Sequence, residues 1–114
     1  MSAAAKTVWD DEKWRNMLGF QGNPADTGNG YTAEQVAAFH IPSLEKLLQY
    51  QQAVRSRTVE FLKNSNDQDL WKTIEIPNRG QMAIAELMVL YLAEINHHIG
   101  QIDYLRGLIL SLRQ

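Results

Sequence analysis

The chain has 114 residues, no cysteine, a net charge of −2 at neutral pH and 45% hydrophobic residues. This length predicts one domain over residues 1–114, and the lack of cysteine excludes disulfides, thiolate metal sites and a cysteine nucleophile. No basic-aromatic stripe indicates a nucleic-acid surface, and no apolar run is long enough to span a membrane. We therefore expect a cytoplasmic protein without nucleic-acid or membrane partners.

The first third of the chain predicts short helices separated by a loop. Residues 1–8 are expected to be flexible, and residues 10–18 to form a short helix. Residues 22–30 predict a loop, because they are crowded with glycine, asparagine, aspartate and proline. Thr32, followed three residues later by Gln35, predicts a capping box at the start of a second short helix.

A long helix is predicted from about Pro42 to Lys63, followed by a short connecting region. Pro42 suits the first turn of a helix, because a residue there does not need its backbone N–H. Ser65 and Gln68 have the spacing of a second capping box, which would open a short helical turn. Residues 74–80 predict a brief extended segment that ends in a turn.

The last helix is predicted from about Gln81 to Leu112, and it carries the most regular hydrophobic seam of the chain. Its seam positions alternate in steps of four and three residues: Ile84, Met88, Tyr91, Ile95, His98, Ile102, Leu105, Ile109 and Leu112. This spacing keeps one stripe facing a partner, so we expect His98 to be buried. A second apolar stripe lies beside the first and needs a further neighbour. Two antiparallel helix pairs are therefore expected to form a homodimeric four-helix bundle.

Four segments of the chain resemble the DinB-like superfamily, in the right order. Residues 97–108, with the run Gly-Gln-Ile-Asp-Tyr-Leu-Arg-Gly, resemble the closing helix of that family. Residues 10–19 resemble its acidic-Trp-Leu-Gly segment, and residues 27–36 its Thr-Gly-x-Gly-x-Thr loop. Residues 50–61 resemble its third long helix. The similarity runs from about Trp9 to Leu110.

The resemblance implies a four-helix bundle, commonly dimeric, that holds a divalent ion with three histidines. One of these ligands comes from the second helix, and two come from the fourth helix at positions i and i+4. Aligned on Gly100, this chain has His98 at the second fourth-helix position and Glu94 at the first. The chain begins where the second helix of the family would end. The expected fold is therefore all-α, a half-bundle that a second copy completes.

Glu94 and His98 are the best candidates for metal ligands, because they lie one helical turn apart. A carboxylate with an imidazole suits several divalent ions, and zinc or nickel is expected here. His97 diverges from His98 by about 100° around the helix, so His40 is the remaining third candidate in one chain. Alternatively, a dimer brings two Glu94/His98 pairs together. The competing interpretation is that no metal binds and Glu94 accepts a hydrogen bond from His98.

These patterns leave several functions open. The resemblance implies a metal-dependent enzyme of the thiol-transferase type, acting on a small-molecule thiol. A metal-binding protein without turnover is also compatible with the same ligands. The alternative is a non-catalytic homodimeric helical module that has lost the metal site. The sequence assigns no catalytic residue, and whether the chain is an enzyme stays open.

Overall fold

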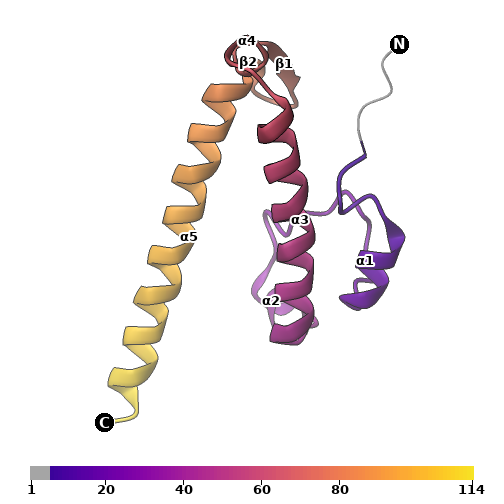
Figure 1. The fold of residues 1–114 in the computed structure, drawn as a ribbon. Helices are drawn as coiled ribbons and strands as arrows, with labels where there is room; N and C mark the ends of the chain where they lie inside the picture. The colour runs from indigo at the N-terminus through magenta and orange to yellow at the C-terminus, as the bar shows by residue number, and fades with distance from the viewer. Residues whose placement is uncertain (1–5) are drawn as a thin grey trace. The chain divides into compact units, whose positions relative to one another are not determined.

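The computed structural model describes residues 6–114, and within them the chain is mostly helical (Figure 1). The elements in chain order are α1 (Glu12–Met17), α2 (Ala33–Ala38), α3 (Leu44–Asn64), α4 (Asp67–Leu70), β1 (Thr73–Ile76), β2 (Gly80–Ala83) and α5 (Ile84–Leu112). The chain divides into a first unit that ends at Lys63 and a second unit that begins at Asn64. Of the segment expected to be flexible, residues 1–5 lie outside the described residues, and Val8 is buried. None of the described helices is long and apolar enough to cross a membrane.

The core of the first unit is an aromatic cluster next to Leu18. The ring of Trp9 lies 5.0 Å from that of Phe20 and 6.0 Å from that of Tyr50, measured between centroids. Trp14 lies 5.8 Å from Tyr50 in the same edge-to-face manner. Such pairs are favoured because the positive edge of one ring meets the negative face of the other. Leu18 is buried, so α1 is fixed through its C-terminal end.

Capping residues set the starts of the short helices α1 and α2, and a glycine follows the end of α1. The Asp11 side chain accepts a hydrogen bond from the backbone N–H of Lys13 and starts α1. Gly19 follows α1 with a φ of 72°, a left-handed conformation that glycine adopts without steric cost. The predicted capping box of α2 is confirmed, because Thr32 and Gln35 each accept a hydrogen bond from the other's backbone N–H.

The loop between α1 and α2 is held by specific hydrogen bonds. The indole Nε1 of Trp9 donates to the carbonyl oxygen of Pro24 at 2.7 Å. The carboxylate of Asp26 accepts hydrogen bonds from the hydroxyl of Tyr31 and from the backbone N–H of Gly28. These bonds tie the loop to the aromatic cluster at one end and to the start of α2 at the other.

The Asp26–Tyr31 hydrogen bond predicts a measurable pH dependence. The Tyr31 hydroxyl, together with the Gly28 N–H, lowers the pKa of Asp26 below its usual value. A carboxyl whose pKa is lower in the folded than in the unfolded state stabilises the fold above its unfolded pKa of about 4. This contribution is lost as the pH falls through the lower, folded pKa.

We therefore expect Tyr31→Phe to raise the pKa of Asp26 toward its usual value. An NMR titration of the carboxyl carbons in both proteins measures this shift. Asp69 is the control, because the Lys72 ammonium lowers the pKa of Asp69 independently of Tyr31. An unchanged Asp26 titration in the variant would contradict the assignment of the shift to Tyr31.

The long helix predicted from Pro42 to Lys63 is confirmed as α3, which begins at Leu44 and ends at Asn64. One basic side chain of α3 also contacts the preceding chain. The guanidinium of Arg57 donates a hydrogen bond to the carbonyl oxygen of Lys6. This bond fixes the described start of the chain against the helix.

The second unit opens with a capping box one residue later than predicted. The side chain of Asn66 accepts from the N–H of Asp69 at 3.1 Å, and Asp69 accepts from the N–H of Asn66 at 3.0 Å. The prediction used Ser65 and Gln68, which have the same spacing. Asparagine and aspartate make the reciprocal pair here, and Asp69 also forms an ion pair with Lys72 at 2.6 Å.

A β-hairpin follows α4 and corrects two predictions. Strands β1 and β2 pair antiparallel, with Thr73 opposite Ala83 and Ile76 opposite Gly80. The predicted turn is confirmed, and Asn78 and Gly80 both have positive φ values there. The extended segment around residues 74–76 therefore has a partner strand, so the fold is mostly helical with a small sheet and not all-α.

The last helix begins at Ile84, so its predicted start at Gln81 was wrong. Residues 81–83 are extended because they pair with β1. The carboxylate of Glu86 then accepts the backbone N–H of Ala83 at 2.9 Å, which satisfies an N-terminal donor and marks the start of α5. Ala83 is buried where the hairpin, α4 and the start of α5 meet.

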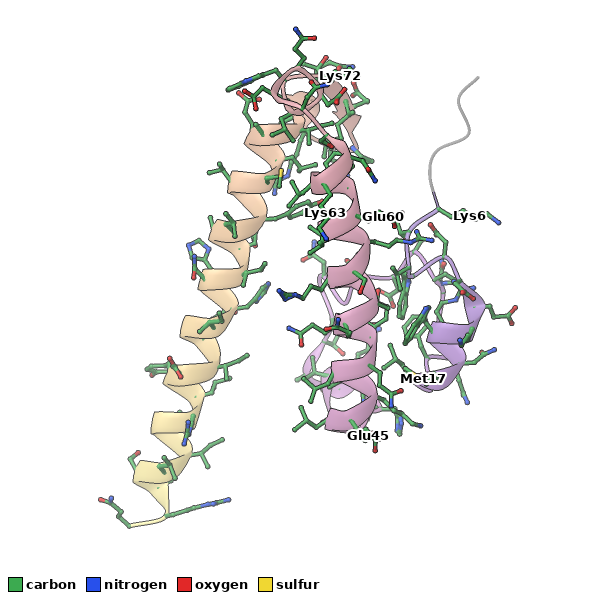
Figure 2. All side chains as sticks on the ribbon, in the orientation of Figure 1. Lys6, Met17, Glu45, Glu60, Lys63 and Lys72 are labelled. Atoms are coloured by element: carbon green, nitrogen blue, oxygen red, sulfur yellow. The ribbon has the colours of Figure 1, made fainter. Side chains whose placement is uncertain are left out.

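Beyond its first two turns, α5 is exposed over its whole length. Every residue from Tyr91 to the C-terminus is exposed, and Figure 2 draws the side chains of α5 along the helix. The hairpin and α4 contact α5 only near its N-terminal end (Figure 1). Within the described residues, no element of its own unit therefore covers the hydrophobic seam of this helix from Tyr91 onward.

Candidate functional site

The candidate site centres on His98 and its neighbours on α5. The Nδ1 atom of His98 lies 3.1 Å from Oε1 of Gln101. An amide oxygen only accepts hydrogen bonds, so this contact matches the tautomer in which Nδ1 donates and Nε2 offers its lone pair to a ligand. Metal-binding histidines commonly donate their second ring N–H to an oxygen in this way, which fixes the tautomer and the ring orientation. Gln101 is therefore placed to support this tautomer of His98.

Glu94 lies one turn before His98 on the same helix, and both side chains are exposed. The expectation that His98 is buried is not met in the described structure, because nothing in the second unit reaches this part of α5. The hydrogen-bond partner of His98 is Gln101 and not Glu94. The hydrogen bond from His98 to Glu94 that the metal-free interpretation expected is therefore not found among the described side chains.

His40 lies in the first unit, between α2 and α3. Its ring packs against Gly19, where an added Cβ would lie 3.1 Å from Cδ2 and 3.2 Å from Nε2 of the imidazole. Across residues 6–114, no three histidine, cysteine, aspartate or glutamate side chains gather in an arrangement that could hold a metal ion. Within the described residues, a single copy therefore lacks the three protein ligands typical of a metal site.

A comparison with protein families decides the family of the chain. The family model described as the DinB superfamily matches residues 5–102, a stretch that includes both Glu94 and His98. The chain belongs to the DinB superfamily. No curated protein and no solved structure gave a significant match. The resemblance identified from residues 97–108 and the loop segments is thereby confirmed.

Sequence reasoning about this DinB chain did not pair Gln101 with His98. The signal was present, because residues three apart on a helix are neighbours on its surface. Glutamine offers both a donor and an acceptor, so only the side-chain geometry reveals that its oxygen faces Nδ1 of His98.

Proposed function

We propose that this DinB-superfamily chain is a homodimeric metal-binding protein, in which the α5 helices of two copies hold one divalent ion. The ligands are Glu94 and His98 of each copy. The observation that carries the proposal is the contact of 3.1 Å between His98 Nδ1 and Gln101 Oε1 on an exposed stretch of α5, one turn from the carboxylate of Glu94. When Nδ1 donates in this contact, Nε2 is available to a metal ion.

The apolar surface of α5 supports a second copy as its partner. Ile95, Ile102 and Leu105 are each more than half exposed and lie on the stripe that contains His98. Burial of one such side chain contributes about 1.5–3 kcal/mol, so a seam of several supports a stable pair. Exposed apolar surfaces of this kind mark interaction sites in soluble proteins.

The position of His98 in α5 favours a shared site. His98 is the central residue of this 29-residue helix. In an antiparallel pair with full overlap the two helix centres coincide, and in a parallel pair identical residues lie level. Both arrangements bring two His98 side chains together. Glu94 is displaced by about 6 Å along the axis, which is within reach of its flexible side chain.

Two Glu94/His98 pairs supply four protein ligands. This number completes the tetrahedral shell of zinc and leaves an octahedral ion such as nickel with open positions. A divalent ion with an open position would supply Lewis-acid activation of a small-molecule thiol, which is the reaction class to assay if nickel is found. With zinc, the proposal is metal binding without turnover.

The test is the metal content of the purified, untagged full chain, loaded with zinc or nickel and measured by elemental mass spectrometry. We expect about half a divalent ion per chain, since two copies share one site. His98→Ala and Glu94→Ala are each expected to weaken the affinity for the metal at least about tenfold, because a lost ligand costs more than about 1.4 kcal/mol, and so to lower the metal content.

The matched control is His97→Ala, which removes the same kind of side chain from the adjacent position. This position lies about 100° around the helix from that of His98. The control variant should keep the parent stoichiometry. Metal retained by His98→Ala, or lost equally from His97→Ala, would contradict the proposed ligands. A parent protein that binds no metal after loading would contradict the proposed function as a whole.

A further inference from the structure

The first unit contains a pocket of about 860 Å³ that the proposed metal site does not use. It lies between the start of the described chain, the loop after α1, helix α2 and the beginning of α3. Ligand-binding pockets commonly have volumes of about 300–1,000 Å³, so this one has room for a small organic molecule.

Aromatic side chains form much of the wall of this pocket. Trp9, Phe20 and Tyr50 belong to the edge-to-face cluster that makes up the core of the unit. Tyr31 and Phe39 also line the pocket. The Trp9–Pro24 hydrogen bond and the Tyr31–Asp26 hydrogen bond hold two of these rings in place before any ligand arrives. Such fixed aromatic walls favour a flat aromatic ligand at low entropic cost.

The polar groups of the pocket carry no fixed charge. Its polar side chains are His40, Gln21, Gln35 and the tyrosine hydroxyls, and no aspartate, glutamate, lysine or arginine lines it. Burial raises the pKa of Tyr50, so that hydroxyl stays protonated. A charged ligand would gain no counter-charge from the residues that line this pocket. The lining therefore favours a neutral ligand.

His40 is held at this pocket by the backbone conformation of Gly19. With a φ of 72° and no Cβ, Gly19 allows the imidazole to approach closely, and an alanine Cβ there would lie 3.2 Å from Nε2. The imidazole is thus positioned as a hydrogen-bonding group at a mostly apolar site.

We propose that this pocket binds a neutral, flat aromatic small molecule that carries a hydroxyl or carbonyl group. Its rings pack against Trp9, Phe20 and Tyr50, and its oxygen forms a hydrogen bond with His40. The inference is independent of the proposed metal site, because all of the lining residues belong to the first unit.

The probe is 1-naphthol, which is neutral at pH 7, titrated into the full chain and followed by ¹H–¹⁵N NMR. The chain has three tryptophans, whose indole N–H signals report on different places. The signal of Trp9 is expected to shift saturably, since its indole lines the pocket. Trp71 lies in the second unit, 68% exposed, and its signal should not move.

Two substitutions in α2 make a matched pair. Ala38→Phe fills the pocket that Ala38 lines and is expected to weaken 1-naphthol binding at least about tenfold, whereas Ala37→Phe places the same ring outside the lining and should not. His40→Ala is expected to weaken binding by about tenfold through the lost hydrogen bond, which gives an independent test if Ala38→Phe fails to fold.

The preference for a neutral ligand is tested with the anion 1-naphthalenesulfonate. We expect its affinity to be at least about tenfold weaker than that of 1-naphthol. Equal binding of this anion would overturn the assignment to neutral ligands. The absence of a saturable shift at Trp9, or undiminished binding by both Ala38→Phe and His40→Ala, would overturn the site itself.

Discussion

Ile102→Glu is expected to separate the proposed dimer into monomers and to abolish its metal binding. Ile102 lies one turn after His98 on the same stripe and is 64% exposed in the single chain. The folded monomer therefore tolerates a charge at this position. In the dimer, the same change buries a carboxylate from each copy in an apolar seam, at a cost of several kcal/mol per ion.

Light scattering coupled to size-exclusion chromatography measures this effect directly. The parent should have twice the chain mass of 13.0 kDa, and the variant should have the mass of one chain. Metal content should fall with the dimer, because one copy alone provides only Glu94 and His98. The control is Ser111→Glu, which adds the same charge to α5 at a position about 180° around the helix from Ile102.

The two readouts separate the parts of the proposal. A monomeric parent would contradict dimerisation through α5. A variant that stays dimeric would show that the copies pair through another surface. A monomeric variant that still binds metal would contradict a site shared between two copies.

Leu18→Ala is expected to destabilise the first unit by about 2–4 kcal/mol, the usual range for removal of a buried leucine side chain. Leu18 is 7% exposed, and within residues 6–114 the only other hydrophobic residues buried to this extent are Val8 and Ala83. With so small a core, the loss of one large side chain removes a large share of the stabilising burial. The cavity would also lie directly beside the aromatic cluster.

Urea unfolding, followed by tryptophan fluorescence and circular dichroism, measures this change in the free energy of unfolding. Ile41→Ala is the matched control, because Ile41 is 78% exposed and its truncation should change the stability by less than about 0.5 kcal/mol. Equal effects of the two substitutions would contradict the assignment of the core to Leu18.

A small core leaves much apolar surface of the chain exposed, and this favours association with a second copy. Both long helices, α3 and α5, carry large apolar side chains that are exposed along much of their length. Burial of apolar surface is the main favourable term in folding and in association. The proposed pairing of α5 helices would bury apolar surface along α5 from Tyr91 onward, where the single chain leaves every residue exposed.

Local sequence patterns by themselves determined most of the secondary structure and the family. The three-and-four spacing predicted α3 and α5, and Thr32 with Gln35 predicted the start of α2, because these features depend on residues within one or two turns. Residues 97–108 carried the family resemblance. Glu94 and His98 were found as a possible pair because their spacing alone places them on one helix face.

Only the tertiary structure decided the rest. Gln81 reads as helical until β2 pairs with β1, and that pairing depends on residues across a turn. The choice of Gln101 as partner of His98 depends on rotamers, which spacing does not specify. The meeting of Gly19 and His40 at an aromatic pocket depends on contacts between segments far apart in the chain. Periodicity reports which face of a helix is apolar, but what covers that face is a property of the packed molecule.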